Sequence, residues 1–151
     1  MDLEVTWKQF PLKDGRKQKQ TFITDLSKIP TRGGVYIFAR KWGSDFEALY
    51  VGKADNLRSR IKTQLNNNLL MNHVYYAPAG ARVVMAGVFW PGRAQQKKKC
   101  LSIIEKALIR YFVSERHDLV NKQGMKLKQH TVLSDGSFSR STMSAQVSVE
   151  K

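Results

Sequence analysis

Two short runs of strand-forming residues, separated by a tight loop, place the strongest constraint on the fold of this chain. Residues 35–39 and 48–51 are rich in β-branched and other apolar side chains, and the loop between them contains Gly43. This pattern predicts an antiparallel hairpin. If the turn is centred near Gly43, facing residues have numbers that sum to about 86, which places Tyr36 opposite Tyr50 on one face. The two phenols are then either an aromatic pair that packs the sheet or part of a site.

A helix is predicted directly after the second run. Asp55 is its expected N-cap. The buried stripe of this helix is formed by Leu57, Ile61 and Leu65. Arg58 and Arg60 flank the stripe, and helical geometry alone does not decide which of them, if either, turns toward the sheet edge. Most arginines on an amphipathic helix lie in solvent, so each is either a contact for a polyanion or a solvated side chain.

The remaining chain adds a third strand and two terminal extensions. Residues 82–90 are typical of a strand, and the polar segment before them, which contains His73, is expected to be irregular. Two alternating runs around Asp14 and Gly15 predict a basic hairpin. We therefore expect an α/β fold of the α+β type, with a central, mainly antiparallel three-stranded sheet flanked by helices. The expected parts are an N-terminal β-hairpin extension (1–28), a main domain (29–133) and a serine-rich flexible tail (134–151).

A second helix, predicted over residues 94–112, contains an acidic residue in an unexpected place. Its buried stripe is formed by Leu101, Ile104, Leu108 and Phe112. At 100° per residue, Glu105 lies only about 40° from Leu101 and therefore inside this stripe. A carboxylate there loses several kcal/mol of hydration unless a cation, a metal or hydrogen bonds compensate it. Glu105 is thus either a site residue or half of an ion pair at the edge of the core.

The charge of the chain indicates what kind of partner it binds. Lysine and arginine number 26 against 12 acidic residues, so the formal net charge is +14, while 42% apolar residues are enough to form a folded core. A folded cation of this size favours a polyanion such as nucleic acid or an anionic membrane surface. Two basic groups are candidates for nucleic-acid binding or, alternatively, for a solvated face. They are Lys97, Lys98 and Lys99 at the start of the second helix and Lys13, Arg16, Lys17 and Lys19 in the N-terminal hairpin.

Insertion into a membrane and secretion are not expected. The longest apolar runs, residues 83–90 and 101–104, are far shorter than the ~20 residues of a spanning helix. The first residues are partly acidic and contain no apolar stretch typical of a signal peptide. The single cysteine, Cys100, cannot form an internal disulfide, and no zinc-ligand spacing is present. We therefore expect a cytoplasmic protein without a membrane partner.

Several separated motifs resemble those of the GIY-YIG nuclease family. They are Gly34-Val35-Tyr36 and Tyr50-Val51-Gly52, whose tyrosines are fourteen residues apart, followed by a helix that carries arginine. The segment from Tyr50 to Ala54, with Leu57 and Arg60 after it, is particularly similar to the N-terminal nuclease domain of the bacterial excision-repair incision subunit. The resemblance covers about residues 29–121, with valine in place of isoleucine in both tripeptides. That subunit is much longer, so the resemblance implies a GIY-YIG fold in a free-standing nuclease domain.

The resemblance also implies a set of site residues. The spacing of the family's helix arginine selects Arg60 over Arg58, and Arg60 would clamp phosphate oxygens. Glu105 matches the family's metal-binding glutamate and would hold one Mg²⁺ (or Mn²⁺) ion. His73 matches a histidine of homing-endonuclease members that could assist proton transfer. Asn121 matches a motif asparagine that would position the metal side or the backbone.

The two motif tyrosines and a lysine complete the implied chemistry. Tyr36 would deprotonate or orient the attacking water, helped by Lys53, whose positive charge would lower the pKa of the phenol. Tyr50 would hydrogen-bond the phosphate or the water. The expected function is metal-dependent hydrolysis of phosphodiester bonds in DNA. Two alternatives remain, a non-catalytic nucleic-acid-binding protein on the same scaffold and an RNA-directed nuclease. The sequence leaves open the specificity of cleavage, a role in restriction, repair or defence, and the choice between monomer and dimer.

Overall fold

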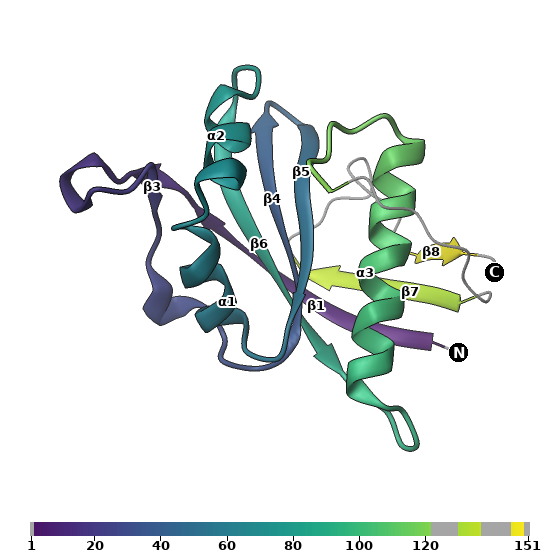
Figure 1. The fold of residues 1–151 in the computed structure, drawn as a ribbon. Coiled ribbons are helices and arrows are strands. Elements are labelled where there is room, and N and C mark those ends of the chain that lie inside the picture. Colours follow the sequence, from purple (N-terminus) through teal and green to yellow (C-terminus); the bar gives the residue numbers. More distant parts are fainter. Residues whose placement is uncertain (1, 122–129, 137–145, 150–151) are drawn as a thin grey trace.

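A mixed sheet with helices on both faces forms the body of the protein (Figure 1). The computed structural model describes residues 2–121, 130–136 and 146–149. The long strands are β1 (Asp2–Pro11), β4 (Gly34–Trp42), β5 (Asp45–Ala54) and β6 (Ala81–Trp90), and the C-terminal strands are β7 (His130–Gly136) and β8 (Gln146–Val149). The helices are α1 (Leu57–Gln64), α2 (Asn68–Tyr76) and α3 (Lys97–Ser114). The strand order is β5-β4-β6-β1-β7-β8, and of these neighbours only β1 and β7 run parallel.

Helices cover the two faces of the sheet from opposite sides (Figure 1). On one face, α1 and α2 pack over Tyr36, Phe38 and Leu49, and on the other α3 packs over Val35, Ile37 and Val51. The alternation along β4 therefore gives each face its own core, as expected for a central strand. The predicted α+β class and the mainly antiparallel sheet are confirmed. The sheet is larger than the three strands predicted.

The first strand corrects the expected N-terminal extension. β1 is not an arm of a separate hairpin, because it pairs antiparallel with β6 inside the main sheet, with Val5 facing Phe89. Its odd-numbered side chains Leu3, Val5 and Trp7 are buried against the core that α3 covers. Only a small hairpin is left, formed by β2 (Lys13–Asp14) and β3 (Phe22–Ile23), with a short 3-10 helix (Arg16–Gln18) at its tip. The alternation in the first ten residues marks a sheet strand rather than an exposed arm.

The segment after α1 is also more regular than predicted. Residues 68–76 form α2, whose N-cap Asn67 accepts a hydrogen bond from the backbone N–H of Leu70. The run of three asparagines that ends α1 therefore also starts α2. α1 itself is capped by Asn56, whose side chain accepts from the N–H of Ser59, and not by Asp55. The buried stripe of Leu57, Ile61 and Leu65 is confirmed.

The C-terminal part of the chain differs from the expected flexible tail where it is described. Residues 134–136 belong to β7 and residues 146–149 form β8, which pairs with β7. The rest of the predicted tail lies outside the described residues. None of the helices in the described part of the chain is both long enough and apolar enough to cross a membrane.

Candidate functional site

Tyr36 and Tyr50 lie on the same face of the sheet, although they are not directly opposite. Tyr36 faces Gly52 and Tyr50 faces Phe38, because a bulge in the pairing of β4 and β5 shifts the register. Facing residue numbers sum to 87 between the turn and the bulge, one more than expected, and to 88 beyond the bulge, which adds Leu49 to β5. The two rings still stack, with centroids 5.9 Å apart and planes inclined by 26°.

One buried glutamine connects the two phenols. Gln64, at the end of α1, donates from Nε2 to the Tyr36 hydroxyl at 2.7 Å and lies 3.3 Å from the Tyr50 hydroxyl. Its carbonyl oxygen accepts from Nδ2 of Asn67 at 3.0 Å, which fixes the orientation of the amide. The two hydroxyls also hydrogen-bond each other. Because the Gln64 amide occupies an acceptor position on each phenol oxygen, the pair keeps one O–H group that can donate to another acceptor. Sequence reasoning did not identify Gln64.

Gly52 allows the Tyr36 ring to lie across β5. A Cβ at position 52 would collide with Cζ and the hydroxyl oxygen of Tyr36. Glycine is therefore required here for close approach of a side chain to the backbone, not for an unusual backbone angle. The Tyr36 hydroxyl thereby reaches toward the edge of the sheet while the ring stays buried.

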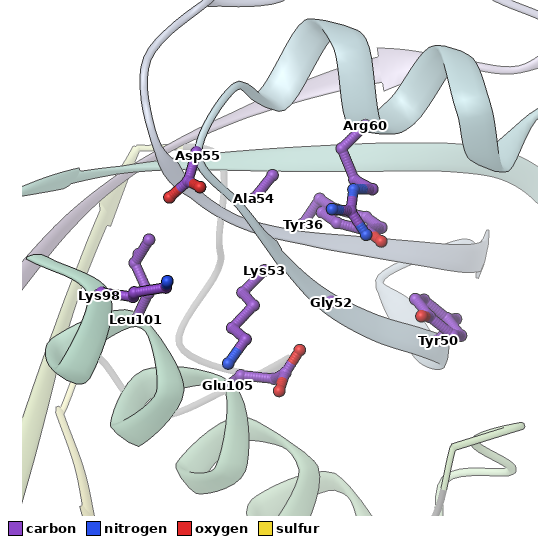
Figure 2. A pocket seen from close by; sticks show the side chains of 10 residues that line it. All are labelled: Tyr36, Tyr50, Gly52, Lys53, Ala54, Asp55, Arg60, Lys98, Leu101 and Glu105. Carbon is purple, nitrogen blue, oxygen red and sulfur yellow. The ribbon is translucent and has the colours of Figure 1, made fainter.

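A cavity of about 300 Å³ opens at this edge, between α1 and α3 (Figure 2). Tyr36 and Arg60 lie on its α1 side, whereas Lys53 and Glu105 lie on its α3 side (Figure 2). The complete lining is Tyr36, Tyr50, Gly52, Lys53, Ala54, Asp55, Arg60, Lys98, Leu101 and Glu105. Five of the residues singled out from the sequence as catalytic therefore share one cavity, together with one of the three lysines at the start of α3.

Glu105 is a half-buried carboxylate at the wall of this cavity. Burial raises the pKa of Glu105, and the positive charge of Lys53 is the largest of the effects that oppose the rise. A hydrogen bond from the Lys53 backbone also stabilises the charged form. Within the described residues Glu105 forms no direct ion pair, and the Lys53 ammonium donates to Ser102 Oγ at 2.5 Å. The carboxylate thus faces open space in the cavity.

Tyr36 does not have the lowered pKa that the resemblance implies. Burial raises the pKa of Tyr36, while the hydrogen bond from Gln64 and the charge of Arg60 act in the opposite direction. The side chain is only 1% exposed, so desolvation of a phenolate dominates. Lys53 lies on the α3 side of β5 and is close to Glu105. The expectation that Lys53 lowers the pKa of Tyr36 is therefore wrong.

Asn121 does not line the cavity and instead binds the backbone of β5. Its amide accepts from the N–H of Val51 at 3.2 Å and donates to the carbonyl oxygen of the same residue. Two further contacts extend this edge clamp, which consists of His117, Val120 and Asn121. The N–H of Ala48 donates to Nδ1 of His117 at 2.8 Å, and the N–H of Val120 donates to the carbonyl of Leu49 at 2.9 Å. Of the two roles expected for Asn121, the structure shows contact with the backbone.

His73 lies apart from the cavity. It is on α2, and its Nε2 is 2.8 Å from the carbonyl oxygen of Asp118. This contact ties α2 to the loop after α3. The histidine that touches β5 is His117, whose pKa is lowered by burial. Sequence analysis did not single out His117, because it is surrounded by charged residues that resemble an exposed loop.

The predicted basic residues divide between two regions. Lys98 lines the cavity, and the side chain of Lys97 fills the space that a side chain at position 33 would need. Lys99 is exposed on the first turn of α3. The hairpin that carries Lys13, Arg16, Lys17 and Lys19 projects on the side of the molecule away from α3 (Figure 1). The two groups therefore do not form one continuous patch around the cavity.

Arg58 has a structural role in the described part of the chain. Its guanidinium donates to the carbonyl oxygens of Ile29 at 2.9 Å and Ser27 at 3.0 Å. These bonds hold the 3-10 helix Leu26–Lys28 and the following residue against α1. The guanidinium of Arg60, in contrast, is exposed at the cavity (Figure 2).

The donor set fits a hard cation held by few protein ligands. Mg²⁺ commonly binds through one or two carboxylates and keeps several waters or substrate phosphate oxygens. Glu105 supplies one such carboxylate at an open cavity, and Asp55 lies farther along the rim (Figure 2). Among the described residues, no group of three or more histidine, cysteine or acidic side chains could enclose a metal ion.

Comparison with protein-family models, curated proteins and solved structures finds no match for this chain.

Proposed function

We propose that the protein is a metal-dependent DNA endonuclease that hydrolyses phosphodiester bonds at the cavity on the edge of β5. The observation that carries this proposal is the meeting of two phenol hydroxyls, one exposed guanidinium and one desolvated carboxylate around a single opening. These groups come from β4, β5, α1 and α3, which are separated in the sequence. Their proximity therefore depends on the tertiary fold and not on a local sequence pattern. The resemblance to GIY-YIG nucleases assigns the same residues to one site.

The proposed chemistry assigns a separate task to each side of the cavity. On the α1 side, the planar guanidinium of Arg60 binds phosphate oxygens through paired hydrogen bonds. On the α3 side, Glu105 holds Mg²⁺ or Mn²⁺, which would neutralise charge on the phosphate and increase the acidity of water. Lys53 adds a positive charge beside the same carboxylate. A phosphate placed between the two sides therefore meets cationic groups from both.

The two tyrosines act as hydrogen-bond donors in this proposal. Because burial raises the pKa of Tyr36, its phenol is protonated at neutral pH. Gln64 donates to both phenol oxygens, and the two hydroxyls also hydrogen-bond each other. The pair therefore keeps one O–H proton that it can donate to the attacking water or to a phosphate oxygen. Tyr36 orients the water rather than removing its proton, which narrows the role suggested by the resemblance.

Cleavage of supercoiled plasmid in the presence of Mg²⁺ or Mn²⁺ tests the proposal. We expect nicked or linear products from the wild type and a loss of about a hundredfold or more in rate from Glu105→Gln. Glu4→Gln, which makes the same chemical change at an exposed position on β1, serves as the matched control and should cleave normally. Fluorescence anisotropy with duplex DNA should show that Glu105→Gln still binds.

Three outcomes would contradict the proposal. A wild type that binds DNA but cuts it with neither metal would favour the non-catalytic alternative. Cleavage of RNA but not DNA would favour the RNA-directed alternative. An active Glu105→Gln variant would remove this carboxylate from the chemistry.

A further inference from the structure

A second cavity lies between the β2–β3 hairpin and α2, remote from Glu105 and α3. It has a volume of about 620 Å³ and is lined by residues of the hairpin tip and of the last turns of α2, among them Arg16, Lys19, Phe22, Asn72, Tyr75 and Tyr76. Phe22 and Tyr75 contact each other within this lining, with ring centroids 6.3 Å apart. Gln20 on the hairpin also donates to Asn66 at 2.9 Å, so the hairpin is held against the helical side of the molecule. We call this feature the hairpin groove.

Two adjacent tyrosines give the hairpin groove large exposed aromatic surfaces. Tyr75 is 57% exposed and Tyr76 is 78% exposed, and their rings meet edge to face with centroids 5.0 Å apart. Exposed aromatic rings that gather at a cavity mark binding surfaces, because their burial by a ligand is strongly favourable. Neither ring contributes to the sheet cores. They are therefore available to a flat ligand.

Cationic groups border the same rings. Lys19 and Arg16 line the groove, with Lys13 and Lys17 exposed on the same hairpin. Arg16 is ion-paired with Asp14 at 2.6 Å, whereas Lys19 forms no ion pair with another described residue. Lys19 also has a positive φ of 58°, which glycine adopts far more readily than lysine. The hairpin thus places the ammonium group of Lys19 at the groove, although the backbone conformation of this residue is unfavourable for lysine.

We infer that the hairpin groove binds an unpaired nucleotide of a single-stranded nucleic-acid segment, with its base on Tyr76 and its phosphate at Lys19. Aromatic rings beside cations match a base with its phosphate, and stacking of this kind requires a base that has left the duplex. The exposed amide of Asn72 is placed to meet polar groups of the base edge. The net charge of +14 favours a polyanion over a neutral peptide as the occupant. The inference rests on the proposed function in that nucleic acid is the ligand, but it does not require cleavage.

One helix connects the hairpin groove with the candidate site. Asn67, the N-cap of α2, hydrogen-bonds Gln64, which holds the two site tyrosines. The last turn of α2 carries Tyr75 and Tyr76. A nine-residue helix is about 13 Å long, the span of a few nucleotides. The substrate class that follows is DNA with an unpaired stretch a few nucleotides from the bond that is cut.

Titration of a short single-stranded DNA oligonucleotide that contains 2-aminopurine tests the inference. The titration is done with a chelator present, so that no cleavage occurs. Binding of the wild type should quench the 2-aminopurine fluorescence through stacking. Tyr76→Ala should weaken binding by about fivefold to a hundredfold, and Tyr76→Phe, which keeps the ring, should bind as the wild type does. Leu69→Ala, on the same helix and 82% exposed in the wild type, is the control outside the groove.

A second variant separates the role of the cation from any effect on folding. Lys19→Gly removes the ammonium and suits the positive φ, so the hairpin should remain folded while affinity for the oligonucleotide falls severalfold and the salt dependence becomes shallower. The inference is overturned if Tyr76→Ala binds the oligonucleotide like the wild type, or if it loses affinity for blunt duplex equally. It is also overturned if Tyr76→Ala alters only self-association in size-exclusion chromatography. Plasmid cleavage by the wild type is measured separately. A wild type that cleaves plasmid but does not quench 2-aminopurine rejects the groove alone, and a wild type that quenches but does not cleave rejects the nuclease alone.

Discussion

Two pairs of tyrosines in this protein have opposite surroundings. Tyr36 and Tyr50 stack at the sheet edge, with Tyr36 only 1% exposed and both hydroxyls held by Gln64. Tyr75 and Tyr76 present most of their surface to solvent at the end of α2. In the first pair the ring is used for packing and the hydroxyl is directed to a cavity. In the second pair the ring faces themselves are available. The same residue type therefore serves as a directed hydrogen-bond donor in one place and as a stacking surface in the other.

Removal of single hydroxyl groups is the strongest test of this contrast. Tyr36→Phe should lower the rate of plasmid cleavage by about a hundredfold or more, because only the phenol oxygen contributes to the chemistry. Tyr50→Phe should have a smaller effect, in keeping with its longer contact of 3.3 Å to Gln64. Tyr76→Phe should leave the affinity for single-stranded DNA unchanged. Kinetics on plasmid and anisotropy on oligonucleotides provide the two measurements.

The hydroxyl experiment also has a clear negative outcome. If both site variants cleave at the wild-type rate, Tyr36 and Tyr50 are an aromatic pair that packs the sheet. Circular dichroism should show that each variant is folded, since loss of one hydrogen bond changes stability by only about 1 kcal/mol.

Displacement of the Tyr36 ring tests whether its buried position matters. Gly52→Ala places a methyl group where the ring lies, so we expect a loss of about 1–3 kcal/mol in the free energy of unfolding and a large loss of cleavage. Gly92→Ala is a suitable control, because a Cβ there meets Gln95 only at ordinary contact distance. Denaturant unfolding and plasmid cleavage measure the two effects. A Gly52→Ala variant of unchanged stability would show that the ring moves away without cost.

The smallest expected effect concerns the carboxylate that faces the site tyrosines across the cavity. Burial raises the pKa of Glu105 above 4.5 in the folded chain, so the folded state keeps a proton that the unfolded state has already released. The free energy of unfolding of the wild type therefore falls as the pH rises from 4.5 through the raised pKa of Glu105 in the folded state. Glutamine does not titrate. Without metal, Glu105→Gln should melt roughly 1–3 °C above the wild type at pH 7, and the difference should vanish below pH 4.5.

Calorimetry across this pH range provides the measurement, with Glu4→Gln as the control at an exposed position. A Glu105→Gln variant that melts below the wild type at pH 7 would indicate that Glu105 stabilises the fold as half of an ion pair.

Much of the candidate site was predictable from local patterns in the sequence. Glu105 stands out because it lies in an apolar stripe, and the structure places it half-buried at a cavity. The same arithmetic places Gln64 about 20° from Leu57 and inside the stripe of α1. This spacing is the signal in the sequence that marks Gln64 as a buried polar residue.

Other features depend on contacts that no local pattern contains. The bulge at Leu49 changes which residue faces Tyr36, and turn chemistry alone does not indicate it. β1 pairs with β6, a partner some eighty residues away in the chain, so its alternation could not reveal which strand it joins. The hairpin groove was not predicted at all, because it depends on tertiary contact between α2 and residues near position 20.

The edge clamp covers part of the free edge of β5. β5 is the outermost strand of the sheet, and an outermost strand normally exposes backbone groups onto which another chain can add. His117, Val120 and Asn121 bind those groups between Ala48 and Val51, and Glu105 accepts from the backbone of Lys53. The strand that carries Tyr50 is therefore closed to addition of a further strand. A second copy could extend the sheet through this part of β5 only by displacing the contacts of the edge clamp.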